Sequence, residues 1–165
     1  SVVTFDDIPE LETRPKMNDQ PQADVPWEVT KAVKPRIRHT MLRVKDLQKS
    51  VDFYTRLFGM TVFRRRDNEG GKYSVVFLGY GDENEQPAIE LTYNWGKDDD
   101  YDKGDGYGHI AIGVPDIYGL CEMLEKEGAE IPRPAGPLKH GGPNASIIAF
   151  VRDPDGYMIE LGERH

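Results

Sequence analysis

The chain reads HTMLRVKDLQKSVDFYTRLFG from His39 to Gly59 and HIAIGVPDIYGLCEMLEKEG from His109 to Gly128, and these two stretches decide the fold. In each stretch a histidine opens an apolar run typical of a strand. An aspartate seven residues after each histidine suits the N-cap of a helix, and a glycine suits its end. The two stretches therefore predict the same strand–helix unit twice.

The repeat continues beyond the helices. Glu90 follows His39 by 51 residues, and Glu160 follows His109 by 51 residues, each within an Ile-Glu-Leu tripeptide. Three strand-like runs follow each helix, near residues 60–66, 72–80 and 87–94 in the first half and 129–132, 145–152 and 157–162 in the second. An internal repeat reveals architecture that a single segment cannot. Each half thus predicts a βαβββ module.

The domain boundaries follow from the repeat and from composition. We expect the first module to span residues 36–104 and the second to span 105–165. Five of the twelve prolines fall in residues 1–35, where no period of 2 or 3.6 is sustained, so this segment is predicted to be an extended N-terminal arm.

Composition excludes several classes of protein. No apolar run approaches the roughly 20 residues that a bilayer span needs, and the first residues lack a signal peptide's basic start, so we expect a cytoplasmic protein that does not bind membranes. The net charge of −8 disfavours nucleic acid as a partner. The single cysteine, Cys121, lies in a predicted helix and is interpreted as a buried apolar residue.

The histidines and glutamates of the repeat are the candidate metal ligands. Side chains alternate between the two faces of a strand, so apolar neighbours such as Leu42 and Ile112 predict a packed face opposite each candidate. Together the four strands would present two nitrogen and two oxygen donors, a set that suits a first-row divalent ion with waters completing an octahedron. The predicted fold class is therefore α+β, with two tandem βαβββ modules forming curved mixed sheets around a metal-containing cup. The predicted metal ligands are His39, Glu90, His109 and Glu160.

Other motifs are interpreted as structural. His140 and His165 lie in a glycine-rich loop and at the terminus, where exposure to solvent is expected. The run from Asp153 to Gly156 has the composition of a turn joining two strands. Neither a phosphate-binding glycine loop with lysine nor a dinucleotide-binding fingerprint occurs.

Residues 37–163 resemble glyoxalase I, within the superfamily that pairs βαβββ modules in bleomycin-resistance proteins and extradiol dioxygenases. The residues that carry the resemblance are HTMLRV at 39–44, DFY at 52–54, LFGM at 57–60, ELTYNWG at 90–96, GHI at 108–110 and DPDGY at 153–157. Members of this family are lactoylglutathione lyases, which isomerise the hemithioacetal of methylglyoxal and glutathione to S-lactoylglutathione. The family's metal ligands fall on the four residues already chosen.

The resemblance also implies roles for particular residues. Glu160 is the expected base that moves a proton between adjacent carbons through an enediolate, with Glu90 acting on the other face or remaining a ligand. Arg43 and Asn94, and less directly Lys139, are expected to bind glutathione, the co-substrate. Some members carry an arginine where this chain has Asp105.

Metal and assembly follow from the same resemblance. Members with histidine at the first ligand position and no long insertion before the Glu-Leu-Thr strand tend to use nickel or cobalt, whereas those with glutamine and an insertion resemble zinc enzymes. His39 and the short loop from Gly81 to Pro87 favour nickel or cobalt, with zinc an alternative. Because the family site forms between modules of two subunits, we expect a homodimer with sites at the interface.

Two alternatives remain at this point. The first is another metalloenzyme of the superfamily, such as an acyl-CoA epimerase or an iron oxygenase, and the second is a non-enzymatic module. Iron oxygenases use two histidines and one carboxylate, and the fourth candidate Glu90 disfavours them. A non-enzymatic drug-binding module would need no histidine–glutamate quartet.

Overall fold

The computed structural model describes residues 35–164, and from Ile37 onward the chain forms one compact unit. The predicted N-terminal arm, residues 1–35, lies outside the described residues except for Pro35, and His165 lies outside them as well. Within the described range, no helix has both the length and the apolar character needed to cross a membrane.

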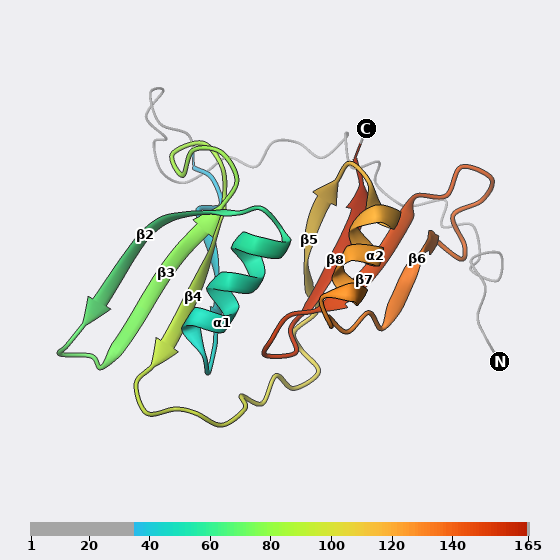
Figure 1. Cartoon of the computed structure of the whole chain (residues 1–165). Helices are drawn as coiled ribbons and strands as arrows, with labels where there is room; N and C mark the ends of the chain where they lie inside the picture. The colour runs from blue at the N-terminus through green and yellow to red at the C-terminus, as the bar shows by residue number, and fades with distance from the viewer. Residues whose placement is uncertain (1–34, 165) are drawn as a thin grey trace, which may run out of the picture. The chain divides into compact units, whose positions relative to one another are not determined.

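The first half of the unit is a four-stranded mixed sheet with one helical segment (Figure 1). Its elements are β1 (His39–Arg43), α1 (Leu47–Asp52), the π-helical turn η3 (Phe53–Leu57), β2 (Thr61–Asn68), β3 (Tyr73–Gly79) and β4 (Ala88–Asn94). The strand order is β1-β4-β3-β2. Strand β1 runs parallel to β4, and the remaining neighbours are antiparallel.

The second half repeats this plan. Its elements are β5 (His109–Val114), α2 (Ile117–Lys126), β6 (Arg133–Pro137), β7 (Ile147–Arg152) and β8 (Met158–Glu163). The order β5-β8-β7-β6 and the parallel pairing of β5 with β8 match the first sheet. The predicted α+β class with two tandem βαβββ modules is confirmed. The predicted module boundary at residue 104 falls between β4 and β5 and stays a prediction.

Both helices begin at the predicted caps. The carboxylate of Asp46 accepts a hydrogen bond from the Lys49 N–H, and that of Asp116 accepts one from the Gly119 N–H, each at 3.0 Å. A cap of this kind satisfies an amide of the first turn that has no partner within the helix. The two equivalent aspartates therefore fix the start of equivalent helices.

The helix ends confirm one expectation and correct another. Gly59 and Gly128 have φ values of +68° and +83°, as expected of glycines that end a helix. The first helix was predicted to continue to Phe58, but after Asp52 it widens into the π-helical turn. There the Thr55 hydroxyl donates to the Val51 carbonyl at 2.7 Å, and a hydroxyl that occupies a main-chain carbonyl competes with the regular α-helical ladder.

The strand predicted at residues 129–132 was wrong. These residues are still leaving α2, because the Ala129 N–H donates to the Leu124 carbonyl at 2.9 Å. The strand begins further along the chain, at Arg133, as β6, and its pairing with β7 is irregular between Arg133 and Gly136. Prolines within and beside β6 lack the N–H that a ladder needs, so the strand is short and lies at the sheet edge.

One hydrophobic core joins the two halves. Leu42 and Leu91 from the first sheet and Ile112 and Leu161 from the second are almost fully buried in the same cluster. These residues alternate along their strands with the histidines and glutamates of the repeat. The apolar faces pack inward, as predicted, and the candidate ligands lie on the opposite faces.

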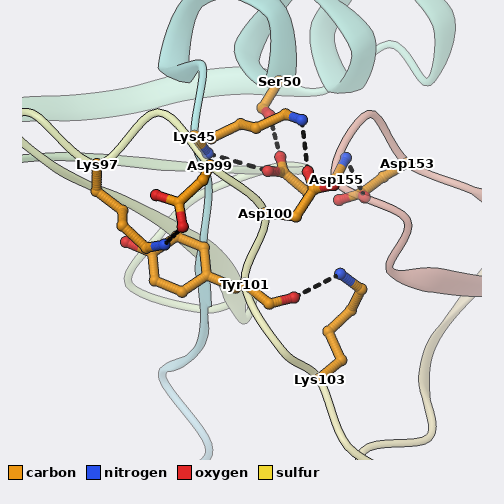
Figure 2. Close-up of polar contacts among 9 residues, drawn as sticks. All are labelled: Lys45, Ser50, Lys97, Asp99, Asp100, Tyr101, Lys103, Asp153 and Asp155. Carbon is orange, nitrogen blue, oxygen red and sulfur yellow. Dashed lines mark hydrogen bonds and ion pairs between the residues drawn. The ribbon is translucent and has the colours of Figure 1, made fainter.

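The predicted turn at 153–156 is confirmed, and it also ties the halves together (Figure 2). Its Asp155 carboxylate accepts hydrogen bonds from the Lys45 N–H at 2.9 Å and from the Ser50 hydroxyl at 3.1 Å. Asp153 accepts one from the Tyr54 hydroxyl at 2.8 Å. The start of the first helix is thereby bonded to the last turn of the second sheet.

Asp153 is the most buried carboxylate of this junction, with 5% of its surface exposed. Burial raises the pKa of its carboxyl from 3.8 to about 6, although hydrogen bonds from Tyr54 and the Tyr157 N–H oppose the shift. The folded chain therefore holds the Asp153 proton more tightly than the unfolded chain does. The protonated carboxyl stabilises the fold fully below the unfolded pKa of 3.8, and this stabilisation is lost as the pH rises through about 6.

We expect the substitution Asp153→Asn to remove this pH dependence, because an amide has a similar shape and stays neutral. As the pH rises from about 4 to about 7, the unfolding free energy of D153N minus that of wild type should increase by about 2–3 kcal/mol. Urea unfolding of the metal-free protein across this range measures the difference. A difference that stays constant with pH would contradict the raised pKa.

Candidate functional site

The first candidate pair joins β1 to β4. His39 lies opposite Ala88, and Glu90 lies opposite Met41, so the two side chains are diagonal neighbours on one face of the sheet. The distance from His39 Nε2 to Glu90 Oε2 is 3.1 Å. The side chains are 34% and 19% exposed, so both are partly accessible to a ligand.

The second candidate pair repeats this geometry on β5 and β8. His109 lies opposite Met158, and Glu160 lies opposite Ala111, which is the same diagonal offset. The distance from His109 Nε2 to Glu160 Oε2 is 3.0 Å, and the side chains are 40% and 28% exposed. Equivalent parallel pairing therefore turns an equal sequence spacing into equal geometry.

The four predicted ligands form two separate His–Glu pairs. Across residues 35–164, no three side chains of His, Cys, Asp or Glu are grouped so that they could hold a metal ion. Each half of the chain thus offers one imidazole nitrogen and one carboxylate oxygen, and the chain carries two half-sets of donors.

The spacing within each pair is that of a hydrogen bond. The nitrogen and oxygen are 3.1 Å apart in the first pair and 3.0 Å apart in the second. An imidazole nitrogen with a carboxylate oxygen is also a donor pair that first-row divalent ions bind.

Each histidine also packs against a phenylalanine that the sequence analysis did not identify. The His39 ring lies edge-on to Phe77, with centroids 5.1 Å apart, and the His109 ring lies similarly against Phe150 at 5.3 Å. Phe77 and Phe150 stand directly opposite the pair glutamates in the antiparallel register. The repeat contained a signal for these residues, because the equivalent strands β3 and β7 each have one phenylalanine.

The two pairs differ at the residue two positions after the glutamate. The Thr92 hydroxyl lies 3.5 Å from Glu90 Oε1 and donates a weak hydrogen bond to it. The equivalent position after Glu160 is Gly162, which has no side chain. Glu160 is also the more exposed of the two glutamates, 28% against 19%.

The residues predicted to bind glutathione occupy two places. Arg43 and Asn94 lie at the ends of β1 and β4 with the same diagonal offset as His39 and Glu90. Arg43 is exposed, and its guanidinium makes no ion pair within residues 35–164, while the Asn94 side-chain oxygen accepts a hydrogen bond from Tyr101 at 3.2 Å. Lys139 lies in the exposed loop between β6 and β7.

The fold and this repeated arrangement define a class of protein. The chain belongs to the Glyoxalase/Bleomycin resistance protein/Dioxygenase superfamily, whose family model matches residues 36–161. The match covers both βαβββ modules, and the predicted resemblance is confirmed.

Particular relatives narrow the class. A protein of Vibrio cholerae named "Probable lactoylglutathione lyase" is 56% identical over 126 residues, which cover 76% of this chain and 88% of the relative. A protein of Escherichia coli O157:H7 named "Lactoylglutathione lyase" is 52% identical over 128 residues, covering 78% of this chain and 92% of the relative. The prediction that the chain is a lyase is confirmed.

A solved structure supports the same fold. The crystal structure of glyoxalase I from Zea mays is 47% identical and superimposes with a TM-score of 0.73 over 78% of this chain. The matched part of this chain spans 44% of the maize chain.

Proposed function

We propose that this chain is a metal-dependent glyoxalase I that isomerises the hemithioacetal of methylglyoxal and glutathione to S-lactoylglutathione. The observation that carries the proposal is the pair of equivalent His–Glu contacts, at 3.1 Å and 3.0 Å, on equivalent strands of two modules. The names of relatives at 52–56% identity supply the substrate.

The residues that would hold the metal are His39 and Glu90 from one module and His109 and Glu160 from another. A bound nickel or cobalt ion would supply Lewis-acid stabilisation of negative charge on the substrate's oxygens. By the family tendency described above, histidine at position 39 and the short connection between β3 and β4 favour nickel or cobalt over zinc.

Glu160 is the proposed proton carrier. Its carboxylate takes the proton from the carbon that bears sulfur and hydroxyl, and returns it to the neighbouring carbonyl carbon. The hydroxyl proton passes to the second oxygen, so the product is an isomer of the substrate. The greater exposure of the Glu160 side chain, compared with that of Glu90, supports this assignment.

Glutathione binding is proposed for the far ends of β1 and β4. Arg43 offers a guanidinium without an ion pair among the described residues, which suits a carboxylate of the tripeptide. Asn94 adds an amide on the same diagonal, and exposed Lys139 could approach from the loop between β6 and β7.

A homodimer would complete the site. Each chain carries two half-sets of donors, and a second copy can place the first pair of one chain against the second pair of the other. Isologous pairing of two identical chains would then create two equal four-ligand sites at the interface.

The first experiment strips the protein of metal and restores nickel, cobalt or zinc one at a time. Thioester formation from methylglyoxal and glutathione, followed by ultraviolet absorbance, should require metal and be fastest with nickel or cobalt. The control is the same metal without protein. Binding of every metal without any thioester would leave the ligand pairs standing and refute the proposed substrate.

A second prediction separates the two glutamates. Glu160→Gln should lower kcat by about 10²–10⁴-fold while metal remains bound, because a positioned base is worth about that much. Glu90→Gln is the matched control and should cost less. Metal content per chain is measured alongside the rates, and equal losses in the two variants would contradict the assignment of Glu160 as the base.

A third prediction tests where the site forms. His39→Ala and His109→Ala should each be inactive, because each removes a ligand from every site. A dimer holding one chain of each kind, isolated by two affinity tags, has one intact site and should show about half the wild-type activity. Sites formed within single chains would give no activity in this mixed dimer.

A further inference from the structure

Arg64 on β2 belongs to a row of side chains that crosses one face of the first sheet. Arg64 lies opposite Phe77 on β3, and Phe77 lies opposite Glu90 on β4. Directly opposite residues of neighbouring strands are in side-chain contact range. The register thus connects a residue near the sheet edge with the first candidate ligand pair.

The Arg64 guanidinium is held in one orientation. Its Cζ lies 3.5 Å from the centre of the Phe77 ring, a close cation–π stack. Its Nε donates to both carboxylate oxygens of Glu83, at 2.9 Å and 3.2 Å. Both charged side chains are partly buried, 36% and 26% exposed, so solvent screens this contact less than a surface ion pair.

The buried Phe77 ring passes this restraint to His39. Phe77 is 6% exposed, and its ring meets the His39 ring edge-on at 5.1 Å with an angle of 76° between the planes. His39 Nε2 in turn points to Glu90. Glu83, Arg64, Phe77 and His39 therefore form one continuous stack that ends at a proposed metal ligand.

The second half lacks this stack. Arg133 stands opposite Phe150, the place equivalent to Arg64. Its guanidinium instead donates to the main-chain carbonyls of Ile148 at 2.6 Å and Pro137 at 2.9 Å. No cation stacks on Phe150 within residues 35–164. Both halves thus have the arginine, but its guanidinium bonds to main-chain carbonyls in the second half and stacks on the phenylalanine in the first.

We propose that Arg64, clamped by Glu83, is a positioning residue that fixes the His39 imidazole through the Phe77 ring. This inference rests on the proposed function, in which His39 is a metal ligand. Groups that orient a ligand from outside typically change metal affinity by about 10–100-fold when they are removed. Arg64 is suited to this role because a planar guanidinium can stack and form two directed contacts at once, which a lysine cannot.

The test compares Arg64→Met with Arg65→Met, a matched change at the exposed neighbouring position. Two readouts are taken on the full chain: nickel affinity, by competition with a chromophoric chelator, and the imidazole signals of His39 and His109 in long-range ¹H–¹⁵N spectra of the metal-free protein. R64M should weaken nickel binding about ten-fold or more and shift or broaden the His39 signals, leaving His109 unchanged. R65M should change neither.

Two further variants identify the route. In a Phe77→Leu background, R64M should add no further loss of nickel affinity, because the intermediary is already gone. Arg64→Lys should behave like R64M. If R64M fails to fold, Glu83→Gln carries the same test, with Glu85→Gln as its control.

The inference is overturned if R64M leaves both readouts as in wild type, if R64K restores nickel affinity fully, or if R64M costs as much in the Phe77→Leu background as in the wild-type background. Failure of the proposed function looks different, since wild type would then form no thioester with any metal. The imidazole spectra of metal-free protein would still decide whether Arg64 orients His39.

Discussion

The parallel pairing of β1 with β4, and of β5 with β8, is the constraint on which the site depends. Parallel pairing places a histidine and a glutamate diagonally across two strands with the same offset in both sheets. A shift of one residue in either register would turn one member of a pair toward the core. The buried residues on the opposite faces, such as Leu91 and Leu161, make such a shift costly and thereby hold the donors in place.

Much of this arrangement was accessible from the sequence. Local sequence signals predicted the helix caps at Asp46 and Asp116 and the glycines that end the helices, and the equal spacing predicted the repeat. Such signals depend on neighbouring residues alone, so tertiary packing did not alter them. The register could be anticipated because alternation separates an apolar face from a polar one. The sequence therefore predicted which residues share a face and which elements carry them.

Other features depend on contacts that no local rule encodes. At the π-helical turn, residues 53–57, a threonine hydroxyl bonds to a main-chain carbonyl. Strand β6 begins further along the chain than expected, because residue 129 is still bonded to the end of α2. The contact between Phe77 and Arg64 depends on the cross-strand register. The bonds from Lys45 and Ser50 to the turn at Asp155 depend on the packing of one half against the other. The ion pair of Glu83, in the loop between β3 and β4, with Arg64 is another contact between separate segments of the chain.

The exchange of Thr92 for Gly162 between otherwise equivalent positions has a further consequence. Two copies of one module are related by rotation, so in a perfectly duplicated site the two carboxylates would be chemically equivalent. A hydroxyl beside one carboxylate and a bare backbone beside the other break that equivalence. In the proposed reaction, this difference between two copies of one module would allow the two glutamates to take different parts, one as the proton carrier and one as a ligand.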